Sequence, residues 1–121
     1  MRENKFVREV EYVLRDNINS PIIVEGDHDV SALREIGVTG EIIKINQGVS
    51  IENFCSRVSS EHTKVILLTD FDRKGIDLQS KISTILQSYG CKVNSRFWYF
   101  IDHSFKIKSV EDLPWLLREN Q

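Results

Sequence analysis

The sequence predicts a single α/β domain built on a parallel sheet of about four strands. Short apolar runs alternate along the chain with segments whose apolar residues recur at helical spacing. The connections between these runs are long enough for the crossovers that parallel strands require. The apolar run at residues 65–68 is the clearest strand, because strands covered on both faces are continuously apolar.

Length and composition limit the classes of protein to which the chain can belong. Its 121 residues suffice for one domain, and 40% hydrophobic and 28% charged residues are ordinary for a soluble globular protein. The net charge of −2 excludes a basic nucleic-acid coat, so a polyanion would bind at a local patch or through a metal. We see no signal peptide, no membrane-length apolar run and only two distant cysteines, and therefore expect a cytoplasmic protein without a membrane partner.

Four segments are expected to be strands, because each is short, rich in β-branched or aromatic residues and followed by turn residues. In chain order they are residues 21–26, 41–46, 64–72 and 93–101. The fourth is assigned from its aromatic run, residues 97–100, whose side chains would pack the core at alternate positions.

Five segments have apolar residues at helical spacing. They are residues 4–16, 27–36, 50–58, 75–89 and 109–117. Ser50 is expected to cap the third helix, and Gly37 and Gly90 to end the second and fourth. The inner face of the fourth is expected to consist of Ile76, Ile82, Ile85 and Leu86. We treat residues 1–19, with the amphipathic helix, as a segment that precedes a domain at residues 20–121.

Acidic residues follow two of the predicted strands. Glu25 follows the first, and Asp70 and Asp72 end the third, where alternate side chains share a face. Because the carboxyl ends of parallel strands meet at one edge, the three carboxylates converge if these strands are neighbours. Hard oxygen ligands at this spacing suit Mg²⁺ or Mn²⁺. The simpler interpretations are a helix cap for Asp72 and a salt bridge from Glu25 to Arg73 or Lys74.

Two segments resemble the motifs of the Toprim domain. Residues 24–33, Val-Glu-Gly-Asp-His-Asp-Val-Ser-Ala-Leu, are similar to its first motif, an apolar strand and Glu-Gly followed by an aspartate and a helix. Residues 67–75, Leu-Leu-Thr-Asp-Phe-Asp-Arg-Lys-Gly, resemble its second motif, Asp-x-Asp with a following glycine. The resemblance covers roughly residues 20–101 and implies a Rossmann-like, stand-alone Toprim protein of the kind found in archaea and bacteria.

The resemblance implies a chemistry. Toprim is the catalytic module of type IA and type II topoisomerases, bacterial primases, OLD-type nucleases and the ribonuclease that matures 5S ribosomal RNA. A similar protein would carry out Mg²⁺-dependent phosphoryl transfer on RNA or DNA, most simply as a nuclease. Glu25 matches the glutamate proposed as general acid/base or metal ligand, and Asp70 and Asp72 match the pair that holds the metal.

Three further positions match the motifs. Gly26 and Gly75 match the turn glycines, and Asp29, which like Asp27 is a candidate helix cap, matches the trailing aspartate of the first motif. The sequence departs from the topoisomerase pattern at Lys74, where those enzymes have a third acidic residue. We see no tyrosine domain of the kind that strand passage needs, and no zinc-binding module or initiation domain of the kind that priming needs. The nuclease-like branches of the family therefore fit better.

Basic residues near the same edge could hold a phosphate backbone. They are Arg73 and Lys74 beside the acidic pair and Lys44 at the end of the second strand. The aromatic run could also offer a surface for stacking bases. The alternative hypothesis is a nucleic-acid-binding accessory module that uses the acidic site without turnover, with a homodimer or a larger complex supplying surface that so small a domain lacks.

Overall fold

The structure is a computed structural model, which describes residues 4–45 and 48–121. Its helices are α1 (Lys5–Asp16), α2 (Asp27–Glu35), α3 (Ile51–Glu61), α4 (Arg73–Ser88), α5 (Arg96–Ser104) and α6 (Leu113–Glu119), with a 3-10 turn, η1 (Val110–Asp112), before α6. Its strands are β1 (Ile22–Val24), β2 (Ile42–Lys44), β3 (Lys64–Leu67) and β4 (Lys92–Asn94). None of the described helices is both long and apolar enough to cross a bilayer.

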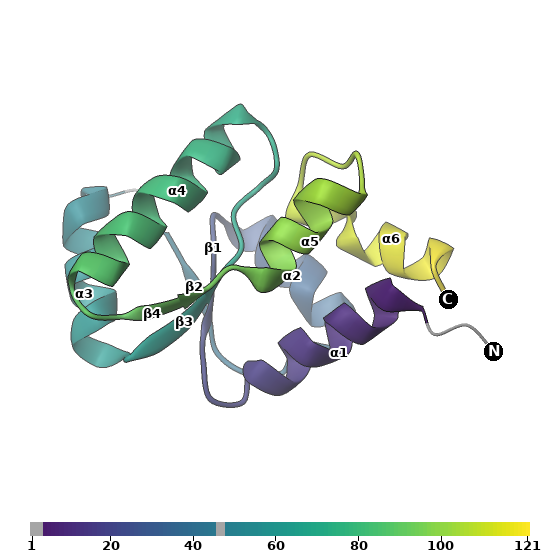
Figure 1. Ribbon diagram of the computed structural model, residues 1–121, viewed down its shortest axis with the longest axis horizontal. Coiled ribbons are helices and arrows are strands. Elements are labelled where there is room, and N and C mark those ends of the chain that lie inside the picture. Colours follow the sequence, from purple (N-terminus) through teal and green to yellow (C-terminus); the bar gives the residue numbers. More distant parts are fainter. Residues whose placement is uncertain (1–3, 46–47) are drawn as a thin grey trace.

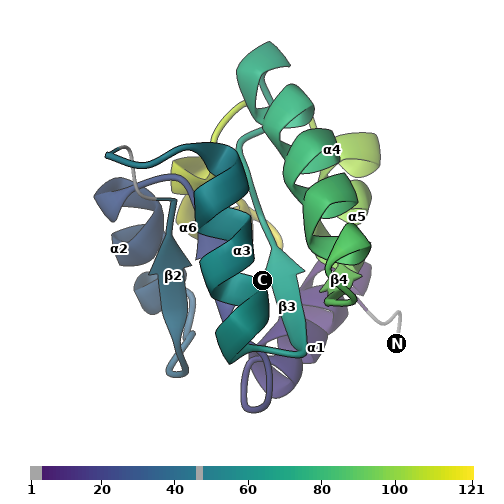
Figure 2. The same ribbon diagram turned by 90° about the vertical axis from the view of Figure 1, so that its left-hand side faces the viewer.

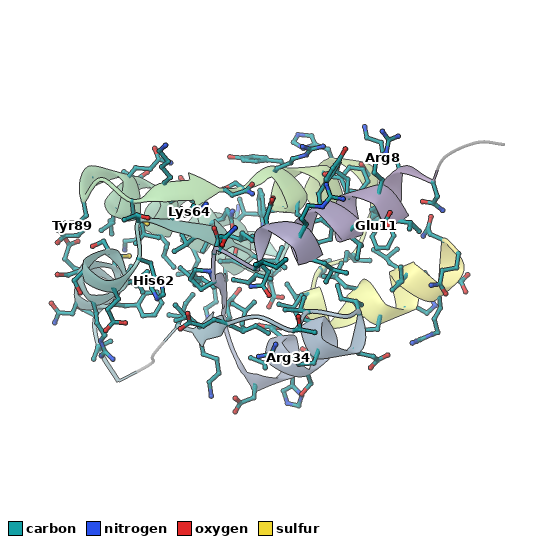
Figure 3. The ribbon with its side chains drawn as sticks, turned by 90° about the horizontal axis from the view of Figure 1, so that it is seen from below. Arg8, Glu11, Arg34, His62, Lys64 and Tyr89 are labelled. Carbon is teal, nitrogen blue, oxygen red and sulfur yellow. The ribbon has the colours of Figure 1, made fainter. Side chains whose placement is uncertain are left out.

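The four strands form one parallel sheet in the order β2-β1-β3-β4. Ile22 of β1 lies opposite both Ile42 of β2 and Ile66 of β3, so β1 and β3 are neighbours in the middle of the sheet. Lys64, labelled in Figure 3, begins β3, and the loop that carries Asp70 follows the other end of this strand. The predicted α/β fold with a four-stranded parallel sheet is confirmed.

Alternation along β3 divides the core between the two faces of the sheet. Val65 and Leu67 join a cluster with residues of α3 and α4, whereas Ile66 and Leu68 join a larger cluster with residues of α1, α2, α5 and α6. Figure 1 shows the sheet between these two sets of helices, and Figure 2 looks onto the face that α3 and α4 cover. Both faces are covered, which explains why residues 65–68 are apolar without interruption.

The prediction of a strand over residues 93–101 was wrong. The chain leaves the sheet after Asn94, whose side chain accepts a hydrogen bond of 3.0 Å from the backbone N–H of Arg96 at the start of α5. The buried residues of α5 are Phe97, Trp98 and Ile101. This spacing is helical, and it decides the structure over the strand preference of aromatic residues.

The predicted inner face of α4 was partly wrong. Ile82 and Leu86 are fully buried as expected, but Ile76 is 42% exposed. Gly75 and Gln79 are buried in its place, because the first turn of α4 packs directly against the loop after β3. The strand predicted at residues 41–46 is observed as β2, Ile42–Lys44, and residue 46 lies outside the described residues.

The expected helix ends are present. Ser50 Oγ accepts a hydrogen bond of 3.0 Å from the backbone N–H of Asn53 at the start of α3. Gly37 and Gly90 follow α2 and α4 with φ angles of 111° and 85°, the left-handed conformation that favours glycine.

Asn17 holds the end of α1 against the start of β2, and we use it to test the fold. Its side chain donates 3.0 Å hydrogen bonds to the carbonyls of Ser20 and Glu41 and accepts one of 2.8 Å from the N–H of Gly40. We expect Asn17→Ala to lower the free energy of unfolding by about 2–4 kcal/mol in urea titrations, because one buried and two partly buried hydrogen bonds to the backbone are lost. Asn19→Ala, at an exposed position nearby, should change it by less than about 0.5 kcal/mol; equal effects would contradict this role.

Candidate functional site

The carboxyl edge of the sheet brings the ends of β1 and β3 together. Glu25 follows β1, and its Oε2 accepts a hydrogen bond of 2.8 Å from the backbone N–H of Asp70 in the loop after β3. The two residues meet, although 45 positions separate them in the sequence, because β1 and β3 pair directly. The structure therefore places the acidic residues of the two motifs side by side.

The loop after β3, residues 68–72, is held by side chains of α4 and α5. Gln79 of α4, only 3% exposed, accepts a hydrogen bond of 3.3 Å from the backbone N–H of Thr69. The Thr69 hydroxyl donates to the carbonyl of Gly75 at 2.6 Å, and the indole N–H of Trp98 donates to the carbonyl of Thr69 at 3.0 Å. These bonds fix the backbone immediately before Asp70.

The segment before α6 also contacts this loop. The backbone N–H of Val110, the first residue of η1, donates a hydrogen bond of 2.8 Å to Oδ1 of Asp70. The N–H of Phe71 donates to the carbonyl of Lys108 at 2.9 Å. Asp70 is therefore held from two sides. Glu25, which follows β1, bonds to its backbone N–H, and Val110 of η1 bonds to its carboxylate.

Two further aspartates begin helices at this edge. Asp72 is the N-cap of α4, and its Oδ1 accepts a hydrogen bond of 2.8 Å from the N–H of Gly75, as the simpler interpretation expected. Asp29, 5% exposed, lies in the first turn of α2 and accepts one of 3.1 Å from the N–H of Gly26, which is the N-cap. A carboxylate has about four lone-pair positions, so these bonds orient both side chains and leave capacity for another ligand.

Burial raises the pKa values of Glu25, Asp70 and Asp29, and the charges of neighbouring carboxylates add to the increase. Burial raises the pKa of Glu25, and the charges of Asp70 and Asp72 raise it further, while a hydrogen bond from the Asp70 backbone and the charge of Lys74 lower it. Burial also raises the pKa of Asp70, against the hydrogen bond from Val110, and the charge of Asp72 adds to the increase. Burial and the charge of Asp70 raise the pKa of Asp29 to about 6. Negative charge is thus concentrated here at a cost that a cation would offset.

The donor chemistry of this cluster fits a hard divalent cation. Carboxylate oxygens are the ligands that Mg²⁺ and Mn²⁺ prefer, and Glu25, Asp70 and Asp72 each have one oxygen oriented by a backbone N–H. Within residues 4–45 and 48–121, no three His, Cys, Asp or Glu side chains close around one point as a ready metal site. A bound ion would therefore have to draw the carboxylates closer together.

Comparisons with known proteins identify the family of the chain. The model of the Toprim domain matches residues 20–100, which include both acidic motifs. The chain belongs to the Toprim domain family. It is 42% identical over 100 residues to a UPF0292 protein of Thermoplasma volcanium, a match that covers 83% of this chain and 84% of that protein. A UPF0292 protein of Pyrococcus horikoshii is 42% identical over 94 residues, or 76% of this chain and 70% of its own length.

A solved structure shares the fold. A putative protein from Aquifex aeolicus matches with a TM-score of 0.77 over 91% of this chain and 99% of that chain, at 24% sequence identity. The match to the Toprim domain model and the small archaeal relatives confirm the resemblance that the sequence predicted, and the solved structure confirms the fold. Toprim domains generally bind Mg²⁺, and membership of the family indicates a metal-dependent role that involves nucleic acid.

The basic residues expected to contact nucleic acid differ in their surroundings in this Toprim domain. Arg73 and Lys74 are exposed in the first turn of α4, next to the acidic cluster. Lys44 ends β2, and its Nζ lies 2.6 Å from Oδ1 of Asp27 in an exposed ion pair. In the aromatic run, Phe97 and Trp98 are buried in the core, whereas Tyr99 is 54% exposed.

Sequence reasoning missed three residues that shape the Toprim site. Gln79 could have been found, because it is a polar residue on the buried face of α4, four positions after Gly75. Trp98 was assigned to a strand and so could not be placed beside the loop after β3. Val110 contributes only its backbone N–H, which leaves no signal in the sequence.

Gly75→Ala tests whether the close approach of α4 positions the acidic loop. A Cβ at this position would lie 2.0 Å from the carbonyl oxygen of Asp70, and a backbone atom cannot rotate away, whereas nothing lies within 4 Å of a Cβ at Gly26. We expect Gly75→Ala to cost about 1–3 kcal/mol of unfolding free energy in urea titrations, despite the better helix propensity of alanine. Ser80→Ala, at an exposed position of the same helix, is the control and should be nearly neutral; a stable Gly75→Ala variant would contradict the packing argument.

The raised pKa of Asp29 predicts a pH dependence of stability. The pKa of this carboxyl is about 6 in the folded protein, against an ordinary value of 3.8. Between pH 3.8 and about 6 the folded state therefore binds more protons than the unfolded state. Its contribution to the free energy of unfolding therefore falls as the pH rises from 3.8 to about 6 and is constant above that range. Urea titrations in EDTA should show Asp29→Asn gaining stability relative to the wild type across this interval. A difference independent of pH, or one reproduced by the exposed control Asp16→Asn, would contradict the assignment.

Proposed function

We propose that the protein is an Mg²⁺- or Mn²⁺-dependent enzyme that cleaves phosphodiester bonds in RNA or DNA. The observation that carries this proposal is the hydrogen bond of 2.8 Å between Asp70 and Glu25, which joins the two acidic motifs at the carboxyl edge of a parallel sheet. Ligand sites of open α/β sheets lie at this edge, and membership of the Toprim family supports a nucleic-acid ligand.

Each acidic residue has a distinct part in the proposed mechanism. Asp70 and Asp72 would hold the cation, which when bound neutralises phosphate charge and favours in-line displacement. Glu25 would transfer the proton, because burial raises the pKa of this carboxyl above its ordinary value and so makes it a better proton acceptor than an exposed glutamate. It would take the proton of the attacking water, or give one to the oxygen that leaves phosphorus. Lys74, close enough to influence Glu25, would contact the phosphate.

The test is incubation of the purified protein with end-labelled single- and double-stranded RNA and DNA, in Mg²⁺, Mn²⁺ or EDTA. We expect cleavage only with a metal, and a decrease of about 10²-fold or more in Glu25→Gln, Asp70→Asn and Asp72→Asn. These substitutions keep an oxygen that can accept the orienting N–H, so the fold should persist, as circular dichroism will check. Asp16→Asn, at the end of α1, is the matched control and should cleave normally.

A second outcome would favour the accessory module over the enzyme. Lys74 lies beside Glu25, at the position where topoisomerases have a third acidic residue, and it reduces the negative charge available to hold metal. Substrate that is bound in the presence of Mg²⁺ but not cut would indicate a binding role without turnover. Substrate that is neither bound nor cut would contradict both functions.

A further inference from the structure

A groove lies beside the acidic cluster, between the start of α3 and the first turns of α4. Its volume is about 510 Å³, and it is lined by Ile51, Arg73, Lys74, Asp77, Leu78 and Lys81. Figure 2 shows α3 and α4 side by side on one face of the sheet. Ile51 is the first residue of α3, and the other lining residues belong to the first nine positions of α4. The proposed cleavage mechanism gives no role to Ile51, Leu78 or Lys81.

The groove combines an apolar floor with a cationic rim. Ile51 and Leu78 pack against the smaller core cluster and remain partly exposed. Lys74 and Lys81 lie four before and three after Leu78, so all three side chains share one face of α4. Arg73 adds a third cation and Asp77 one carboxylate, so the net charge of the lining is +2.

The groove adjoins the proposed site of cleavage through Lys74 and Arg73. Lys74 lines the groove and is also close enough to Glu25 for its charge to lower the pKa of that carboxyl. Arg73 follows Asp72 directly, at the N-terminus of α4, where the helix dipole favours an anion. A ligand in the groove would therefore hold its negative charge between the cationic rim and the acidic cluster.

A nucleotide has the complementary pattern, because a flat apolar base is joined to an anionic phosphate. The volume of about 510 Å³ lies within the range of roughly 300–1,000 Å³ usual for small-ligand sites. In a duplex, each base is stacked on both faces and paired along its edge, so a base can enter such a groove only where the strand is unpaired. The carboxylate of Asp77 offers an acceptor to an amino group of that base.

We propose that this groove holds an unpaired base of single-stranded nucleic acid, on Ile51 and Leu78, with the flanking phosphates on Arg73, Lys74 and Lys81. The inference rests on the proposed function for its choice of nucleic acid as ligand, but not for cleavage. It assigns a substrate class, single-stranded or locally unpaired nucleic acid. It also gives α4, whose N-cap is the acidic residue Asp72, a role in binding that substrate.

The experiment uses oligonucleotides with one 2-aminopurine base, whose fluorescence increases when the base leaves its stack. We would titrate the whole protein in EDTA with a single strand and with the same sequence as a duplex, and measure anisotropy and 2-aminopurine emission. We expect the single strand to bind at least about tenfold more tightly, and its emission to rise on binding.

Two variants and one control locate the binding. Lys81→Ala, at an exposed position, should weaken single-strand binding and reduce its salt dependence by about one unit of slope, as loss of a phosphate contact does. Leu78→Ala should reduce both the affinity, by about fivefold, and the 2-aminopurine response. Lys92→Ala, an exposed lysine at the start of β4 on the opposite edge of the sheet, should change neither.

The outcomes separate this inference from the proposed cleavage. Single-strand binding with the expected variant effects but no cleavage in Mg²⁺ supports the groove and contradicts the enzyme. Equal affinity for duplex and single strand, an unchanged emission, or equal losses in Lys81→Ala and Lys92→Ala would overturn the inference, whatever the cleavage assay shows. Absence of nucleic-acid binding would overturn it as well, and would leave the groove to a ligand of another kind.

Discussion

The hydrogen bond from the backbone N–H of Asp70 to the carboxylate of Glu25 is the contact on which the rest of the site depends. It crosses from the end of β1 to the loop after β3, and it exists because these strands are paired neighbours. This one bond gives the partly buried N–H of Asp70 a partner and also orients the carboxylate of Glu25. It therefore ties the two acidic motifs together beyond the pairing of the strands that precede them.

The other contacts of the acidic loop serve to keep that bond in place. Gln79 and Trp98 hold the backbone of Thr69, and the absence of a side chain at Gly75 lets α4 approach the carbonyl of Asp70. Burial and, to a smaller extent, the charges of neighbouring carboxylates raise the pKa values of Glu25 and Asp70, so holding these groups together in the charged form is unfavourable. The packing of two helices therefore supplies the constraint that keeps an unfavourable concentration of charge together.

Contacts to the loop extend beyond the part of the chain that the Toprim domain model matches. That match ends at residue 100, whereas the carbonyl of Lys108 and the N–H of Val110 bond to Phe71 and Asp70. The chain after α5 thus returns to the carboxyl edge of the sheet and fixes the side chain of the first aspartate in the Asp-x-Asp motif. The cationic groove between α3 and α4 lies beside the same cluster, although the protein as a whole has a net charge of −2.

The sequence by itself determined the parallel sheet, most helix ends, and the placement of Glu25 and Asp70 at one edge. Those features follow from local periodicity, capping residues and the rule that parallel strands end together. Tertiary structure decided the rest. The aromatic residues of α5 formed a helix because Phe97, Trp98 and Ile101 can be buried together only at helical spacing. The position of Gln79 on the buried face of α4 follows from the helical pattern, but its partners, the backbone groups of Thr69 and Leu67, do not, because hydrogen bonds between residues far apart in sequence are set only when the chain has packed.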